Sequence, residues 1–193
     1  MNSKMKKKKK FENIPNIITL SRLFTIPLLL VLFPINVYFF KPLSALIFLA
    51  SAIADILDGT IARKYQVTSK IGALMDPIVD KMIDATALFL LVEGGILYTW
   101  MAVVIVCRDI AVSGIRLIAL EYGFSVDVNT SGKIKTAATE AGIILLLVGR
   151  DLFGFPCHAI GMSFIWIALF FTVYSGYLYW VSFWNKFSMR IVS

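Results

Sequence analysis

The sequence predicts an all-α, polytopic membrane protein with six transmembrane helices and an N-terminal interfacial segment. Of its 193 residues, 59% are hydrophobic and only 16% are charged, and the mean hydropathy is +0.81. A soluble domain has about 45–50% apolar and about 25% charged residues. Apolar stretches also recur along the chain at close to the roughly 20 residues that cross a bilayer. This composition excludes a disordered chain, a disulfide scaffold and a collagen-like chain.

Polar and turn-forming residues divide the chain into its expected elements. We expect a disordered basic tail over 1–10 and a single six-helix membrane domain over 11–193, whose first segment, 11–22, lies at the membrane surface. The expected spans are about 23–40, 43–61, 76–92, 97–120, 134–148 and 159–183. Pro27 falls inside the first span and is expected to kink it, whereas Pro77 is expected near the start of the third.

The net charge of +7 comes from 19 Lys and Arg against 12 Asp and Glu, and much of the excess lies at Lys4 and in the run at 6–10. With this tail in the cytoplasm, six spans place most other basic residues on the same side. We therefore expect a multi-pass cell-membrane protein with both termini cytoplasmic. Nucleic-acid binding is another interpretation of a Lys run, but we do not expect it because the rest of the chain offers no basic aromatic face. Cys107 and Cys157 suggest buried packing, and the single His158 has no evident ligand partner.

Carboxylates inside apolar spans are the strongest functional signal. Asp55 and Asp58 are about 60° apart on one helix face, and Asp76 and Asp80 are about 40° apart on the next helix. A short connection allows the two faces to oppose each other, so that the four carboxylates converge. Ionisable residues at membrane depth mark functional sites, and clustered anions repel unless cations bridge them. Two hard divalent ions about 4 Å apart would resolve the repulsion and suit phosphoryl chemistry.

The residues beside these carboxylates suit a phosphate-bearing ligand. Gly59, Ala62 and Gly72 leave space for a ligand near the backbone, and Arg63 is a fixed cation that can hold a phosphate. One alternative is structural: small residues that pack helices, and carboxylates paired with Arg63, Lys64, Lys70 and Lys81. Another is a divalent-metal transporter whose carboxylates line an ion path, although a transporter would not require the small residues and the arginine at these spacings.

The segments 55–63 and 72–80 read DILDGTIAR and GALMDPIVD. They resemble the signature D-x-x-D-G-x-x-A-R, spacer, G-x-x-x-D-x-x-x-D of the CDP-alcohol phosphatidyltransferases, with every fixed position present. The resemblance implies a six-helix membrane enzyme that forms a homodimer. It also implies Mg²⁺ or Mn²⁺, with two ions expected, holding the pyrophosphate of a CDP-linked lipid.

The resemblance implies a role for each matching residue. Asp55, Asp58 and Asp76 would be metal ligands, and Asp80 would ligate or lie beside the metals and act as the general base. The residues that would contact or admit the CDP-lipid are Asp58, Gly59, Ala62, Arg63 and Gly72.

A second, basic set of residues bears on the acceptor alcohol. Arg108 and Arg116 are about 80° apart on the fourth span, and Lys133 and Lys135 open the fifth. Such a set near the carboxylates suggests an anionic acceptor, such as a sugar or polyol phosphate. The alternative is charge balance against Asp109, Glu121 and Glu140, or positive-inside placement.

Four segments narrow the resemblance to the bacterial phosphatidylglycerophosphate synthases. They are NIPN at 13–16 with Thr19 and Arg22 following, Asp76-Pro77 followed by Asp80-Lys81, RDIAVSGIR at 108–116, and GKIKT at 132–136. This resemblance implies phosphatidyl transfer from CDP-diacylglycerol to glycerol 3-phosphate with release of CMP, and it adds Thr19 and Arg22 to the acceptor-binding set. Asp109, where Glu is common, and Asp84, a fifth carboxylate where an apolar residue is expected, depart from the pattern. They leave inositol phosphate or phosphatidylglycerol open as the acceptor.

Overall fold

The structure is a computed structural model that describes residues 22–35, 40–65, 70–124, 130–149, 151 and 154–191. Within its helices, the side chains at 58–65, 70–76 and 189–191 lie outside this description. The described chain is all-helical, as predicted. Its helices are α2 (Thr25–Leu32), α3 (Phe40–Tyr65), α4 (Lys70–Glu93), α5 (Thr99–Glu121), α6 (Thr130–Leu147) and α7 (Cys157–Ile191).

Helices α3 to α7 coincide with the second to sixth expected spans, but some predicted limits and the predicted kink at Pro27 are wrong. The first expected span was to end at Phe40, yet this residue begins α3, and α2 covers only eight residues. Pro27 lies in the first turn of α2, where its missing N–H costs no intrahelical bond, so it does not kink a span. Helix α4 begins at Lys70, so Pro77 is inside the helix rather than at its start.

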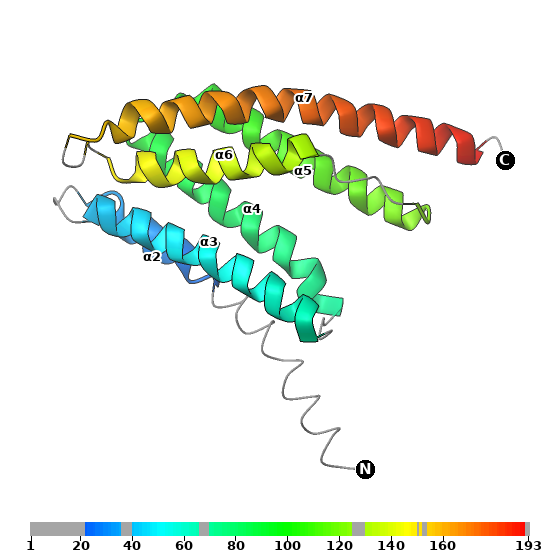
Figure 1. Cartoon of the computed structure of the whole chain (residues 1–193), viewed down its shortest axis with the longest axis horizontal. Helices are drawn as coiled ribbons and strands as arrows, with labels where there is room; N and C mark the ends of the chain where they lie inside the picture. The colour runs from blue at the N-terminus through cyan, green and yellow to red at the C-terminus, as the bar shows by residue number, and fades with distance from the viewer. Residues whose placement is uncertain are drawn as a thin grey trace, which may run out of the picture.

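The helices lie side by side in an elongated bundle (Figure 1). Helix α7 runs beside α6 and α5, α2 packs against α3 and α4, and α3 also contacts α6. With 35 residues, α7 is about 52 Å long at 1.5 Å per residue. One buried cluster receives side chains from all six described helices, among them Leu29, Phe48, Leu88, Met101, Ile143 and Ile165.

Two glycines set the spacing between α6 and α7. A Cβ atom on Gly142 would lie 2.8 Å from Ile165 Cδ1 and 3.2 Å from the Gly161 carbonyl oxygen. A Cβ atom on Gly161 would lie 2.9 Å from Leu146 Cγ. Because neither residue carries a side chain, the two helix backbones approach more closely than larger residues would allow.

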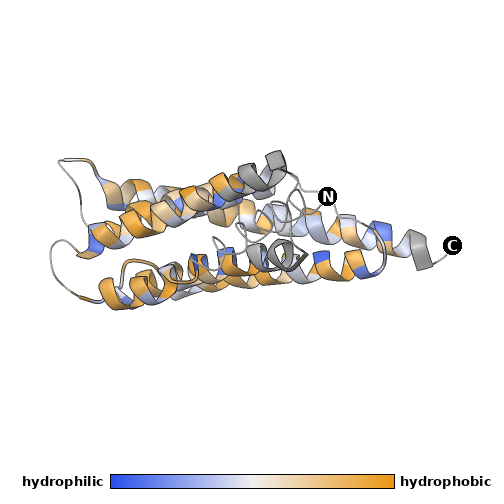
Figure 2. Cartoon of the chain, turned by 90° about the horizontal axis from the view of Figure 1, so that it is seen from below, coloured by the Kyte–Doolittle hydropathy of each residue, from blue (hydrophilic) through white to orange (hydrophobic). Residues whose placement is uncertain are grey.

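Apolar residues recur along the helices (Figure 2), and many of their large side chains are exposed. Two described segments, Phe40–Leu57 and Cys157–Ser188, are long and apolar enough to cross a membrane, and only 22% and 33% of their apolar windows are buried inside the chain. The exposed apolar side chains include Phe24 and Phe170, which are 75% and 67% exposed. Surfaces of this kind need lipid or another chain against them. The expectation that both cysteines are buried is wrong for Cys107, which is exposed on α5; Cys157 is buried.

Candidate active site

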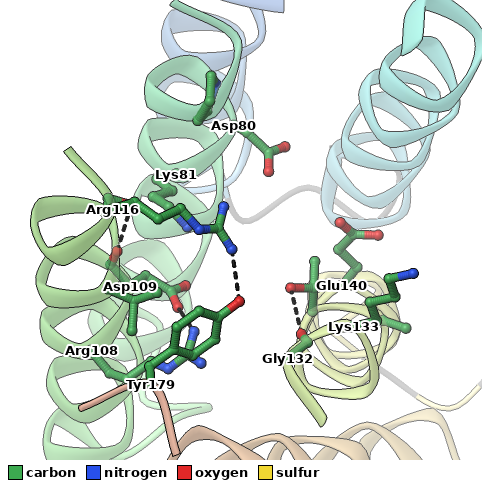
Figure 3. A pocket seen from close by; sticks show the side chains of 14 residues that line it. Asp80, Lys81, Arg108, Asp109, Arg116, Gly132, Lys133, Glu140 and Tyr179 are labelled. Carbon is green, nitrogen blue, oxygen red and sulfur yellow. Dashed lines mark hydrogen bonds and ion pairs between the residues drawn. The ribbon is translucent and has the colours of Figure 1, made fainter. Parts of the chain in front are cut away.

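A cavity of about 430 Å³ opens between four helices and is lined by several charged and polar side chains (Figure 3). Helix α4 forms one wall, α5 another and α6 the third, and α7 contributes one aromatic side chain. The lining residues are Pro77, Asp80, Lys81, Arg108, Asp109, Val112, Ser113, Arg116, Gly132, Lys133, Thr136, Ala137, Glu140 and Tyr179.

The α5 wall of this cavity is basic. Arg108 donates to Asp109 Oδ1 from Nη1 at 3.1 Å and to Ser175 Oγ from Nη2 at 2.5 Å. Its Nε is buried and has no hydrogen-bond partner among the described residues. Arg116 donates from Nη2 to the Tyr179 hydroxyl at 2.8 Å. Lys133, from α6, lines the same space and is exposed.

Two carboxylates lie on the α4 and α6 sides of the cavity. Asp80 and Glu140 both point into the space between these helices (Figure 3), and both are half-buried. The cavity therefore brings the predicted general base and three of the predicted acceptor-binding residues to one place.

Arg22, ahead of α2, joins the carboxylates of two helices. Its Nη1 is paired with Asp55 of α3, and its Nη2 donates to Asp80 of α4 at 3.1 Å. Although the guanidinium is 5% exposed, Asp55 and Asp80 are 45% and 32% exposed. The facing carboxylates of α3 and α4 thus come within the width of one guanidinium group, so a cation between them is electrostatically favoured.

Most other residues of the predicted metal and CDP-lipid sites have side chains outside the described part of the chain. The side chains of Asp58, Gly59, Ala62, Arg63, Gly72 and Asp76 lie outside the described residues, and so does the whole of Thr19. In the part of the chain that is described, no group of three or more His, Cys, Asp or Glu side chains could hold a metal ion. The oxygen donors of Asp55 and Asp80 nevertheless are of the type that hard divalent cations prefer, so the described half of the predicted ligand set fits such an ion.

Two members of the predicted acceptor-binding set do not line the cavity. Lys135 is 2% exposed, and its Nζ donates to Asp109 Oδ2 at 2.5 Å. Asp109, 7% exposed, therefore holds both Lys135 and Arg108, so charge balance accounts for these contacts. Arg22 lies against Asp55 and Asp80 instead.

Sequence reasoning missed several residues of the cavity. The sequence pattern gives neither Lys81 nor Glu140 a binding role, yet both line the space. The charge pattern also does not include Tyr179 of α7, which lines the cavity, or Ser175 of α7, which accepts a hydrogen bond from Arg108. A usable signal existed, because they are polar residues one helical turn apart in an apolar span, the same pattern that singled out the aspartates.

Comparison with known proteins identifies the family of the chain. The family model described as CDP-alcohol phosphatidyltransferase matches residues 12–174. A CDP-diacylglycerol–glycerol-3-phosphate 3-phosphatidyltransferase from Rickettsia typhi is 32% identical over 169 residues, covering 87% of this chain and 95% of the relative. The Bacillus subtilis enzyme of the same name is 33% identical over 188 residues, covering 90% and 96%.

A plant protein extends the similarity beyond bacteria. The CDP-diacylglycerol–glycerol-3-phosphate 3-phosphatidyltransferase 2 of Arabidopsis thaliana is 31% identical over 186 residues, covering 89% of this chain and 80% of the relative. The family match spans most of the chain, including the carboxylate-bearing helices and the basic wall of the cavity. The chain therefore belongs to the CDP-alcohol phosphatidyltransferase family and is a phosphatidyl-transferring enzyme.

Proposed function

We propose that this enzyme transfers the phosphatidyl group of CDP-diacylglycerol to sn-glycerol 3-phosphate, giving phosphatidylglycerophosphate and CMP. The observation that carries the proposal is the single cavity in which Asp80 faces Arg108, Arg116 and Lys133. The names of the relatives point to the same reaction. Since the chain belongs to an enzyme family, the transporter alternative loses its basis.

The basic wall supports a phosphate-bearing acceptor. A guanidinium group matches the geometry of phosphate oxygens and can bind two of them at once. Arg108, Arg116 and Lys133 would hold the acceptor phosphate, and Thr19 stays in the proposed set. Lys135 would act indirectly through Asp109, and Arg22 is better supported at the carboxylate end, because that is where its contacts lie.

The carboxylate end supplies the proton transfer. With its phosphate on the basic wall, the acceptor would direct a hydroxyl towards the side of Asp80. Asp80 takes the proton from this hydroxyl as its oxygen attacks the lipid-linked phosphorus, and the bond from that phosphorus to CMP breaks. CMP leaves with the electron pair, and the phosphatidyl group is bonded to the acceptor oxygen.

Asp55, Asp58, Asp76 and Asp80 are the proposed ligands of Mg²⁺ or Mn²⁺, with two ions the expected number. When bound, the metal neutralises charge on the pyrophosphate. Residues Asp58, Gly59, Ala62, Arg63 and Gly72 would contact or admit the CDP-lipid. The oxygen donors that α3 and α4 present at Arg22 support this assignment.

The proposed setting is the cell membrane. The exposed apolar segments of α3 and α7 support a multi-pass arrangement of one catalytic domain over 11–193, with six crossings, a basic tail over 1–10, and both termini and the active site cytoplasmic. We also propose a homodimer, on family resemblance.

The test is CMP release by the purified protein with CDP-diacylglycerol and Mg²⁺. Separate reactions would contain glycerol 3-phosphate, inositol phosphate, serine or phosphatidylglycerol. We expect release with glycerol 3-phosphate and little with the others. Release only with another acceptor would change the substrate, and no release with any of them would refute the proposed transfer reaction.

A further inference from the structure

Tyr179 is the side chain that α7 contributes to the cavity. It is 3% exposed and belongs to a small buried cluster with Val112, Ala119 and Phe183. It lies beyond residue 174, where the family match ends, so family membership assigns it no role.

Both arginines of the basic wall converge on this one ring. The guanidinium carbon of Arg108 lies 5.6 Å from the Tyr179 ring centroid, and that of Arg116 lies 5.5 Å from it. These distances are within the range of cation–π attraction. The Tyr179 hydroxyl also accepts the 2.8 Å hydrogen bond from Arg116 (Figure 3). A single side chain therefore fixes the position of two cations that would otherwise repel each other.

Neighbouring residues of α7 and α6 also contact Arg108 or lie close to Tyr179. Ser175, one turn before Tyr179, accepts from Arg108 Nη2. At Gly176, an added Cβ atom would lie 3.4 Å from Arg108 Cγ, so the backbone of α7 packs closely beside the stem of the arginine. On α6, a Cβ atom at Gly132 would meet the Tyr179 ring at 3.7 Å.

We propose that Tyr179 is a positioning residue that sets recognition of the acceptor's phosphate by holding Arg108 and Arg116 on one wall of the cavity. The proposal rests on the proposed function, because it takes glycerol 3-phosphate as the acceptor. Tyr179 accepts one hydrogen bond from Arg116, so its own O–H remains a donor that a phosphate oxygen can use.

The test is steady-state kinetics of CMP release for Tyr179→Phe, which keeps the ring and removes the hydroxyl. We expect the KM for glycerol 3-phosphate to rise about tenfold, as for loss of a hydrogen bond to a charged group, while the KM for CDP-diacylglycerol changes less than about twofold. Inorganic phosphate, used as a competitive inhibitor, should lose affinity by a similar factor. Tyr179→Leu, which also removes the ring, should raise the acceptor KM further.

The matched control is Tyr177→Phe, because Tyr177 lies on the same helix and is 67% exposed. It should leave both KM values unchanged. If the unmodified enzyme uses glycerol 3-phosphate and Tyr179→Phe does not change its KM, this inference alone is overturned. Equal rises in both KM values would assign Tyr179 a merely structural role and overturn it as well. If the unmodified enzyme releases no CMP with glycerol 3-phosphate, the proposed function fails first.

Discussion

Asp80 is the residue at which the two ends of the site meet. It is paired with Arg22 on one side and lines the cavity on the other, so it is near both the carboxylate group and the acceptor space. A half-buried carboxylate that is open to a cavity is placed to accept a proton from a hydroxyl group bound there.

We predict that Asp80→Asn reduces CMP release by at least about a hundredfold, because an amide cannot act as the base. The variant should still elute as a folded protein in detergent, since Asn can accept the Arg22 hydrogen bond. The matched control is Glu93→Gln at the exposed end of the same helix, which should keep normal turnover. Normal turnover in Asp80→Asn would remove Asp80 from its catalytic role.

For Arg116→Ala, we predict a KM for glycerol 3-phosphate raised about tenfold or more, with a much smaller change in the KM for CDP-diacylglycerol. The physical reason is the loss of one charge-assisted contact to the acceptor phosphate. The lipid KM, measured on the same preparation, is the internal control. Equal effects on both would argue against an acceptor-phosphate site at Arg116.

At the residue scale, the sequence is informative where a side chain contradicts its surroundings. Asp55 and Asp80 are conspicuous because charge is costly in an apolar span. Tyr179 is less conspicuous, because a single aromatic residue is ordinary in an apolar span and only its spacing of one helical turn from Ser175 marks it. Lys133 and Lys135 show a different limit: they are two positions apart, about 200° on a helical wheel, so only one of them can face the cavity. The sequence shows two lysines but does not predict which of them faces the cavity.

At the element scale, apolar length locates five helices well but misplaces some of their ends. Hydropathy indicates where the apolar part of a helix ends, whereas the helix itself extends as far as its backbone hydrogen bonds continue. Helix α4 therefore begins at Lys70, several residues before the expected span, and α7 continues to Ile191. The expected first span failed for the converse reason, because an apolar run bridged the end of α2 and the start of α3.

The glycine contact between α6 and α7 yields a prediction at this scale. Gly142→Ala should lower the thermal midpoint in detergent, since its Cβ would overlap Ile165 and approach the backbone of Gly161, and overpacking costs about 1–3 kcal/mol. The matched control is Gly114→Ala in α5, where a Cβ meets nothing within 4 Å. It should hold or raise the midpoint, because Ala favours a helix. An unchanged midpoint in Gly142→Ala would show that the two helices can separate easily.

For the whole molecule, the site depends on several separate elements at once. Asp55 and Asp80 come from different helices, and the basic wall comes from α5 and α6. A site assembled in this way forms only when the bundle is folded. The proposed metal would bind at the carboxylates of α3 and α4.

We therefore predict that EDTA abolishes CMP release and that Mg²⁺ or Mn²⁺ added in excess restores it. The physical reason is that clustered carboxylates need a compensating cation before an anionic pyrophosphate can approach. The measurement is CMP release across a titration of each metal, with Ca²⁺ as a comparison. Full activity after exhaustive chelation would contradict the metal proposal.

The close contact between Gly142 and Gly161 also bears on how the acceptor is bound. Helix α6 carries Lys133 and Glu140, and α7 carries Tyr179, so the glycine contact helps to set the relative position of the two helices that carry these residues. Two cavity surfaces built on one locked helix pair are preorganised: they need not be assembled when a ligand arrives. Binding therefore spends little of its free energy on ordering the protein, and more of it remains as affinity for a small, highly hydrated anion.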